Sequence, residues 1–164
     1  QQSGVTLKAI LLTHGHFDHI GAVSELKKQF QVPVYAMAAE VVIMEDFTLN
    51  LSANWASPFS VKCDHELTDG EKISVAGFDI IAYHTPGHTK GGACYYIESE
   101  QVLFSGDTIF CHSVGRTDFP TGSMGELRRS VQRMLQILPD TTRVMPGHEC
   151  DTSIADEKRY NPYS

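Results

Sequence analysis

Thr13-His-Gly-His-Phe-Asp-His19 lies between an apolar run over residues 9–12 and a helical pattern over residues 20–30. The stretch holds four side chains that can bind a metal ion: His14, His16, Asp18 and His19. Neutral imidazoles and a carboxylate at this density suit Zn²⁺ or a similar transition metal. A surface turn that happens to contain histidines is the alternative, and the histidines further along the chain disfavour it.

The backbone pattern around this stretch indicates two metals rather than one. Residues 5–13 read as a buried strand, and residues two apart in an extended segment share a face, so His14 and His16 can reach the same ion. Gly15 between them relaxes the backbone. Asp18 and His19 lie at the start of the following helix and would point elsewhere.

Composition sets limits on the class of protein. A chain of 164 residues fits one domain, residues 1–164, and 41% hydrophobic residues are enough for a real core. The net charge of −7 and the pI near 5.5 argue against binding of nucleic acid. Apolar runs of about 18 residues, which a membrane span needs, do not occur.

The cysteines favour a reducing compartment. Four are scattered along the chain without a Cys-x-x-Cys pair: Cys63, Cys94, Cys111 and Cys150. Reduced thiols fit a cytoplasmic protein, and no signal peptide is recognisable. The chain does not begin with Met, so secretion stays an open alternative.

The remaining pattern alternates helices and strands. Apolar periodicity predicts a helix over residues 20–30, a strand over 32–37 and a helix over 38–49. Residues 50–61 have weak periodicity and read as an irregular lid where substrate contacts often lie. Trp55 within this lid is interpreted as local packing.

The second half of the chain is rich in strands. We expect strands at residues 72–75, 78–83, 93–98, 102–105 and 143–145. A capping box, Ser123 to Glu126, opens a helix before the last of them.

Three of these strands end in small turn residues and then present one side chain of a metal-ligand type: His88, Asp107 and His148. Each alone would read as a turn residue. If the strand ends meet at one rim, seven such groups converge there together with the first cluster. The other histidines, His65, His84 and His112, lack this context and read as ordinary polar residues, although His112 could line the pocket.

Four motifs carry a family resemblance: residues 13–19, Pro86-Gly-His-Thr89, Ser105-Gly-Asp-Thr108 and Pro146-Gly-His-Glu149. Together they resemble the metallo-β-lactamase superfamily, and within it the small glyoxalase-II-like (hydroxyacylglutathione hydrolase-like) hydrolases. Residues 115–119 and the tail at 159–163 are similar to the short bacterial members. The resemblance covers nearly the whole chain.

This resemblance implies an α/β (α+β) fold, an αββα sandwich with a binuclear site. The implied ligands are His14, His16 and His88 for the first metal, Asp18, His19 and His148 for the second, and Asp107 as the bridge between them. Two Zn²⁺ ions are the default, with iron or manganese as known replacements.

The implied enzyme is a metal-dependent thioester hydrolase acting on S-lactoylglutathione or a related acyl-thiol. Two metals about 3.5–4 Å apart can share a water and lower its pKa, and the resulting bridging hydroxide attacks the carbonyl carbon. Asp18 can orient that nucleophile, and thiolate is a soft leaving group that suits zinc. Arg116 falls where the family has a basic substrate contact; pairing with Asp118 is the equal alternative.

Other functions fit the pattern less well. A persulfide dioxygenase would use one iron held by His14, His88 and Asp107. The best-known zinc β-lactamases have Cys in place of Asp107 and lack the histidine after Asp18, so antibiotic hydrolysis is not expected. RNA processing would need an inserted domain, and a structural metal protein would need only a closed set of four ligands.

The start of the chain gives a further expectation. Superfamily members usually have additional strands before the one predicted at residues 5–13, so we expect a chain that is truncated at its N-terminus. That strand would then have an open edge with unpaired backbone groups. Self-association through this edge is the expected protein contact, and a small thioester is the expected ligand, with neither nucleic acid nor membrane as a partner.

Overall fold

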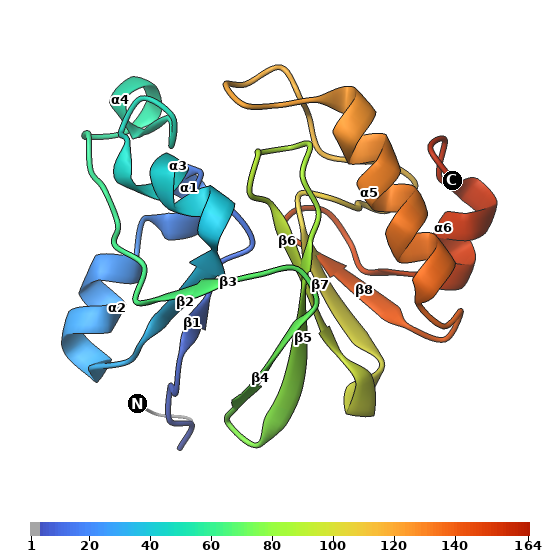
Figure 1. The fold of residues 1–164 in the computed structure, drawn as a ribbon, viewed down its shortest axis with the longest axis horizontal. Coiled ribbons are helices and arrows are strands. Elements are labelled where there is room, and N and C mark those ends of the chain that lie inside the picture. Colours follow the sequence, from blue (N-terminus) through green and yellow to red (C-terminus); the bar gives the residue numbers. More distant parts are fainter. Residues whose placement is uncertain (1–3) are drawn as a thin grey trace.

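Two β-sheets face one another and helices cover their outer surfaces (Figure 1). This computed structural model describes residues 4–164. The first sheet has three parallel strands in the order β1 (Ile10–Leu11), β2 (Val34–Met37) and β3 (His65–Leu67). Helix, sheet, sheet and helix therefore follow as layers, which confirms the predicted αββα sandwich.

The second sheet has six strands in sequence order among the described residues. They are β4 (Glu71–Val75), β5 (Phe78–His84), β6 (Ala93–Ile97), β7 (Val102–Gly106), β8 (Arg143–Pro146) and β9 (Thr152–Ser153). Neighbours are antiparallel except for β7 and β8, which are parallel. Strands β5, β7 and β8 therefore run in the same direction, and their C-terminal ends lie at the same rim of the sheet.

Helices pack on both outer faces. On the first sheet lie α1 (Phe17–Ile20), α2 (Val23–Phe30), η1 (Ala38–Glu40), α3 (Val41–Glu45) and α4 (Ser52–Trp55). On the second lie α5 (Met124–Ile137) and α6 (Ile154–Tyr160), while η2 (Glu98–Glu100) joins β6 to β7. The predicted capping residue Ser123 is the N-cap of α5, and its Oγ accepts a hydrogen bond from the Glu126 N–H at 3.4 Å.

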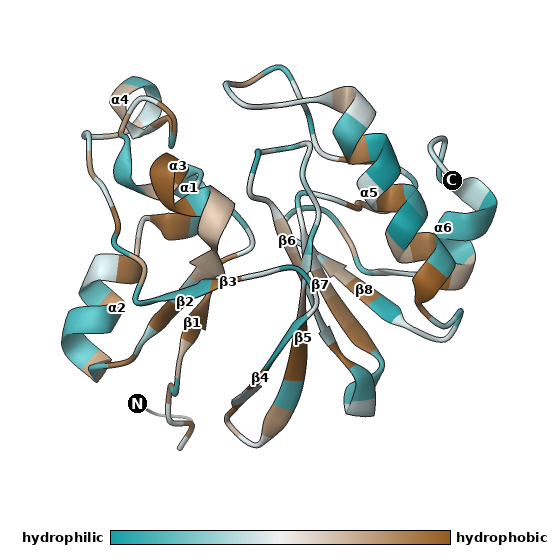
Figure 2. Cartoon of the chain, in the orientation of Figure 1, coloured by the Kyte–Doolittle hydropathy of each residue, from teal (hydrophilic) through white to brown (hydrophobic). Residues whose placement is uncertain are grey.

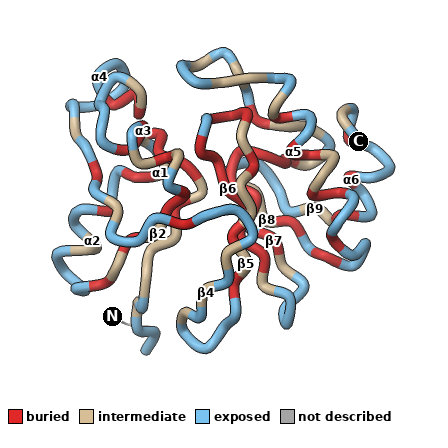
Figure 3. The backbone as a smooth tube through the Cα atoms, viewed as in Figure 1, coloured by how far each residue is buried: buried red, intermediate tan, exposed pale blue. Residues whose placement is uncertain are grey.

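The strands are apolar and the outward helix faces are polar, so the buried residues collect in the middle of the molecule (Figures 2 and 3). Met37 and Leu67 from the first sheet pack with Ile80, Ala82 and Tyr95 from the second. Burying a side chain of this size stabilises the fold by about 1.5–3 kcal/mol. This shared layer holds the two sheets, and so the two halves of the rim, in a fixed relation.

Several predicted boundaries were too generous. The first strand covers only Ile10–Leu11 rather than residues 5–13, because only Ile10 and Leu12 donate hydrogen bonds to the neighbouring chain segment. In place of the one helix predicted over 20–30 there are two, α1 and α2, separated by residues 21–22. The helix predicted over 38–49 ends at Glu45.

The segment at residues 50–61 is not an irregular lid throughout. It contains α4, and the buried Asn50 side chain ties it down by donating to the Met44 and Phe59 carbonyls at 3.3 and 2.9 Å. The interpretation of Trp55 as a packing residue was wrong, because its side chain is 64% exposed.

Strand β1 lies at the end of its sheet in the described part of the chain. The N–H groups of Ile10 and Leu12 bond to Pro33 and Tyr35, so the Leu11 N–H and C=O face the free side. The expected open edge is confirmed.

Of the helices at residues 4–164, none combines the length and hydropathy that crossing a bilayer requires. The single domain over residues 1–164 stays a prediction, with residues 1–3 outside the described residues.

Self-association through this edge is a testable expectation. We expect a concentration-dependent dimer in sedimentation velocity, because an unpaired edge offers a row of hydrogen-bonding groups to a second copy. Leu11→Pro removes one outward N–H without taking a bond from β2, so it should weaken the dimer. A monomer at all concentrations would contradict the expectation.

Candidate metal centre

The structure brings all seven predicted ligand residues together at the rim. Their ligand atoms form three overlapping groups, each within 4.8 Å: His14, His16 and His88; His14, His19 and Asp107; and Asp18, His19 and His148. They come from the loop after β1, from α1 and from the loops that follow β5, β7 and β8. The site therefore draws on both sheets.

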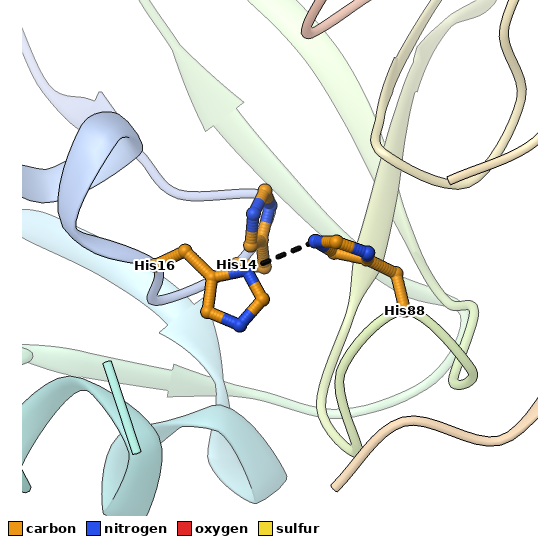
Figure 4. A group of neighbouring side chains, drawn as sticks. All are labelled: His14, His16 and His88. Atoms are coloured by element: carbon orange, nitrogen blue, oxygen red, sulfur yellow. Dashed lines mark hydrogen bonds between the residues drawn. The ribbon is translucent and has the colours of Figure 1, made fainter. Parts of the chain in front are cut away.

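The first group is a cluster of three imidazoles (Figure 4). His16 Nδ1 and His88 Nε2 lie 2.9 Å apart, and the His14 ring is 4.9 Å from that of His16 and 4.7 Å from that of His88. His88 Nδ1 contacts the Arg116 carbonyl oxygen at 2.7 Å. Because a carbonyl only accepts, Nδ1 of His88 carries the proton and its Nε2 presents a lone pair to the cluster.

The group of Asp18, His19 and His148 is more open to solvent. His19 Nε2 and His148 Nε2 are 3.2 Å apart, and His148 Nε2 lies 3.4 Å from Asp18 Oδ2. The His148 side chain is 51% exposed, and it lines the pocket beside the site.

Asp107 lies between the two groups. Its Oδ2 is 3.5 Å from His88 Nε2, and its Oδ1 is 3.5 Å from His19 Nε2. Its side chain is only 9% exposed. This is the position that a carboxylate shared by two metal ions would need.

The electrostatics of the site favour a bound cation. Burial lowers the pKa of His14 well below its usual value and that of His16 to about 3, and burial also lowers the pKa of His19. These imidazoles are neutral at pH 7 and offer lone pairs. His14 Nε2 and Asp107 Oδ1 are buried without a hydrogen-bond partner among the described residues. Such atoms are costly unless an ion completes them, so the residues present fit metal binding.

A buried carboxylate holds the two ligand loops against each other. Glu40 accepts from the Gly15 N–H at 2.6 Å, from Thr89 Oγ1 at 2.9 Å and from the Gly91 N–H at 2.9 Å. Gly15 separates His14 from His16, and Thr89 follows His88. Burial raises the pKa of Glu40 to about 7, against the opposing effect of its three donors.

Two glycines are required by close approach. A Cβ on Gly15 would lie 2.8 Å from Met44 Cγ, and Gly15 has no positive φ, so space rather than backbone freedom explains this residue. A Cβ on Gly147 would lie 2.5 Å from Asp107 Oδ1 and 2.7 Å from His19 Cε1. Only glycine lets the loop after β8 close over the site.

A pocket of about 420 Å³ opens onto this centre. Apart from ligand-type residues it is lined by Phe17, Leu51, Phe110, Ser113, Val114, Arg116, Phe119 and Glu149. Leu51 is the contribution of the segment that we expected to be a lid.

Arg116 lines the pocket and also pairs with its neighbour. Its Nε and Nη2 donate to Asp118 at 2.6 and 2.7 Å, and its guanidinium lies 4.0 Å from the centre of the Phe119 ring. Both side chains of the ion pair are mostly exposed. The structure therefore shows the ion pair and leaves the guanidinium at the pocket wall.

The other three histidines lie outside the centre. His65 stacks on Tyr35 at 4.6 Å, and His84 Nε2 contacts the Lys90 carbonyl at 2.9 Å. His112 does not line the pocket, because its ring packs 5.1 Å from that of Tyr160.

Sequence reasoning missed Glu40 and the aromatic residues Phe110 and Phe119. Glu40 was part of a predicted helix, and an acid in a short helix usually faces solvent. The signal in the sequence was the pair of apolar residues three before and four after it, Met37 and Met44, and both are buried in the structure.

Comparison with known proteins gives one family match and several relatives. The model of the Metallo-beta-lactamase superfamily matches residues 1–148. A probable metallo-hydrolase, YqgX, from Bacillus subtilis is 34% identical, over 99% of this chain and 78% of its own length. A hydroxyacylglutathione hydrolase, GloC, from Haemophilus influenzae is 34% identical with the same coverage.

Solved structures agree with this. The BLEG-1 B3 metallo-beta-lactamase is 40% identical with a TM-score of 0.92, over 99% of this chain and 79% of that one. TTHA1623, solved in a di-iron-bound form, is 35% identical with a TM-score of 0.87, over 99% and 81%. ETHE1 from Myxococcus xanthus is 32% identical with a TM-score of 0.78, over 98% and 64%.

The position of Asp107 gives a prediction about metal content. Asp107→Ala should lose most bound metal, because it removes the one carboxylate that contacts both groups. Elemental analysis of protein purified without added metal measures this. His65→Ala is the matched control and should keep its metal; retention of two metals by Asp107→Ala would show that the bridging role is wrong.

Glu40 gives a second prediction. Glu40→Ala leaves three buried donors unpaired, so it should cost about 1–3 kcal/mol of unfolding free energy. It should also weaken metal binding about 10–100-fold, as the loss of a supporting group does at other metal sites. Denaturant unfolding of the metal-free protein and metal titration measure the two effects.

Glu45→Ala, on the exposed face of α3, is the control and should change neither quantity. Unchanged metal affinity in Glu40→Ala would mean that the two loops hold their positions without the carboxylate.

Proposed function

This chain belongs to the metallo-beta-lactamase superfamily, and from that premise we propose that it is a binuclear metallohydrolase that cleaves thioesters. The fold implies divalent metal binding, and the clustered histidines and aspartates fit it. S-lactoylglutathione or a related acyl-thiol is the proposed substrate class. The GloC relative, a hydroxyacylglutathione hydrolase, supports this class.

One observation carries the proposal of two metals. Six of the seven ligand-type residues form two groups, Asp107 lies 3.5 Å from a member of each, and one Zn²⁺ ion takes only about four ligands. We propose His14, His16 and His88 for one ion, Asp18, His19 and His148 for the other, and Asp107 for both. Zinc is the default for this set of nitrogen and oxygen donors, with iron or manganese as alternatives; the TTHA1623 structure contains two irons.

When bound, such metals lower the pKa of a water and polarise a carbonyl group. The residues of the chain supply the rest. Neutral, buried imidazoles hold their lone pairs inward, and Asp107 provides one charge to both groups. Asp18 lines the pocket beside His148, and its proposed role is to orient the attacking water.

The pocket wall fits an acyl-thiol with a polar carrier. Phe110, Phe119 and Leu51 give an apolar surface for the acyl group beside the centre. Arg116 at the wall is the proposed contact for the polar carrier, because its guanidinium stays mostly exposed although Asp118 pairs with it.

A mononuclear iron persulfide dioxygenase is the second candidate. The three residues that it would need do meet in the structure: His88 Nε2 is 3.5 Å from Asp107 Oδ2, and His14 belongs to a group with each of them. It leaves four of the seven ligand-type residues without a role, His16, Asp18, His19 and His148, and this disfavours it.

Hydrolysis of β-lactams is a further activity to measure. The best-known zinc β-lactamases have Cys at the position of Asp107, so the aspartate argues only against that class of β-lactamase. The BLEG-1 neighbour is a B3 metallo-beta-lactamase, and its similarity to this chain is high enough that an antibiotic substrate is a fair comparison.

The proposed compartment is the cytoplasm, which the four free cysteines fit, and neither nucleic acid nor membrane is a proposed partner.

The proposal predicts two transition metals per chain and hydrolysis of S-lactoylglutathione. Elemental analysis and release of free thiol measure the two quantities on one preparation. One iron without zinc, together with oxygen consumption on glutathione persulfide, would favour the dioxygenase. Turnover of a cephalosporin far above that of any thioester would move the assignment to antibiotic hydrolysis.

A further inference from the structure

Two cysteines lie together beside the metal centre and have no role in the proposed hydrolysis. Cys111 is half-buried and Cys150 is exposed, and both are free thiols. Cys111 comes four residues after Asp107, and Cys150 two residues after His148. They follow the parallel neighbours β7 and β8, so chain direction delivers both thiols to the same end of the sheet.

A single buried carboxylate fixes both cysteine segments. Glu157, on α6, is fully buried, and its two oxygens accept from the His112 N–H at 3.0 and 3.1 Å. Its Oε1 also accepts from Thr152 Oγ1 at 2.7 Å. The residue after Cys111 and the residue two after Cys150 therefore share one anchor.

The backbone turns at both cysteines. His112 has φ +56° and Glu149 has φ +68°, values that residues other than glycine rarely adopt. Each lies directly beside one of the cysteines. The neighbouring Cys150 side chain raises the pKa of the Cys111 thiol.

We propose that Cys111 and Cys150 are a redox-active dithiol that closes reversibly to an intramolecular disulfide. The oxidant is a low-molecular-weight disulfide such as oxidised glutathione. The exposed Cys150 thiolate attacks one sulfur of the oxidant, whose S–S bond breaks and releases one thiolate. Cys111 then loses its proton to solvent and attacks Cys150 Sγ, which releases the second thiolate. The two protein thiols lose two electrons, and the oxidant is reduced to two thiols.

The bond would tether the loops that carry Asp107 and His148. Both loops reach the metal centre from adjacent strands, and Glu157 accepts a hydrogen bond from each of them. Disulfides in reducing compartments are usually transient and sensing rather than structural, which fits an exposed pair of this kind.

The test uses the metal-loaded protein and oxidised glutathione, with remaining thiols capped by N-ethylmaleimide before intact-mass measurement and peptide mapping. We expect a product that has lost two of its four thiols, carries no glutathione, and gives one peptide pair joined through Cys111 and Cys150. Cys111→Ser should stop at a glutathione adduct on Cys150. Cys63→Ser is the matched control and should form the same disulfide as the unchanged chain.

Two results would overturn the proposal. One is a glutathione adduct on Cys150 that persists in the unchanged chain, which would show that Cys111 cannot reach it. The other is protection of both thiols by added Zn²⁺ with a third metal per chain. Cys111, His112 and Glu157 also lie within reach of one ion, so that result would make the cluster a metal site instead.

Discussion

The Glu40 carboxylate is the interaction on which the rest of the site depends. It is fully buried, and a buried carboxylate is stable only when its oxygens are hydrogen-bonded. Its donors come from the loop after β1 and from the loop after β5, which belong to different sheets. The same bonds that satisfy the carboxylate therefore fix the distance between His16 and His88.

From this constraint the chemistry of the centre follows. Loops held this closely exclude water, and exclusion of water keeps the imidazoles of His14 and His16 neutral. Neutral imidazoles cannot pair with Asp107 as cations, so buried polar atoms are left without partners. The protein accepts this local cost because a metal ion can remove it, a common reason why sites of this kind are poorly satisfied on their own.

The sequence predicted which ligand-type residues come together better than it predicted the framework that holds them. A strand that ends in small residues and then presents a histidine or aspartate is a local pattern, and His88, Asp107 and His148 were found through it. The length of β1 depends on hydrogen bonds to a distant segment, so the apolar run overestimated it. Trp55 is exposed although its residue type favours burial. Glu40 and Glu157 were missed because acids on short helices usually face solvent, and only tertiary contacts show that these two do not.

Because the centre takes His14 and His16 from one sheet and His88, Asp107 and His148 from the other, it does not exist until the two sheets have docked. Contacts between residues so far apart in sequence form late and slowly during folding. A metal ion that binds only the docked form adds its binding free energy to that form, about 4 kcal/mol at a thousand times its dissociation constant. Metal supply would then govern the fraction of newly made chains that reach the compact state, before any substrate is met.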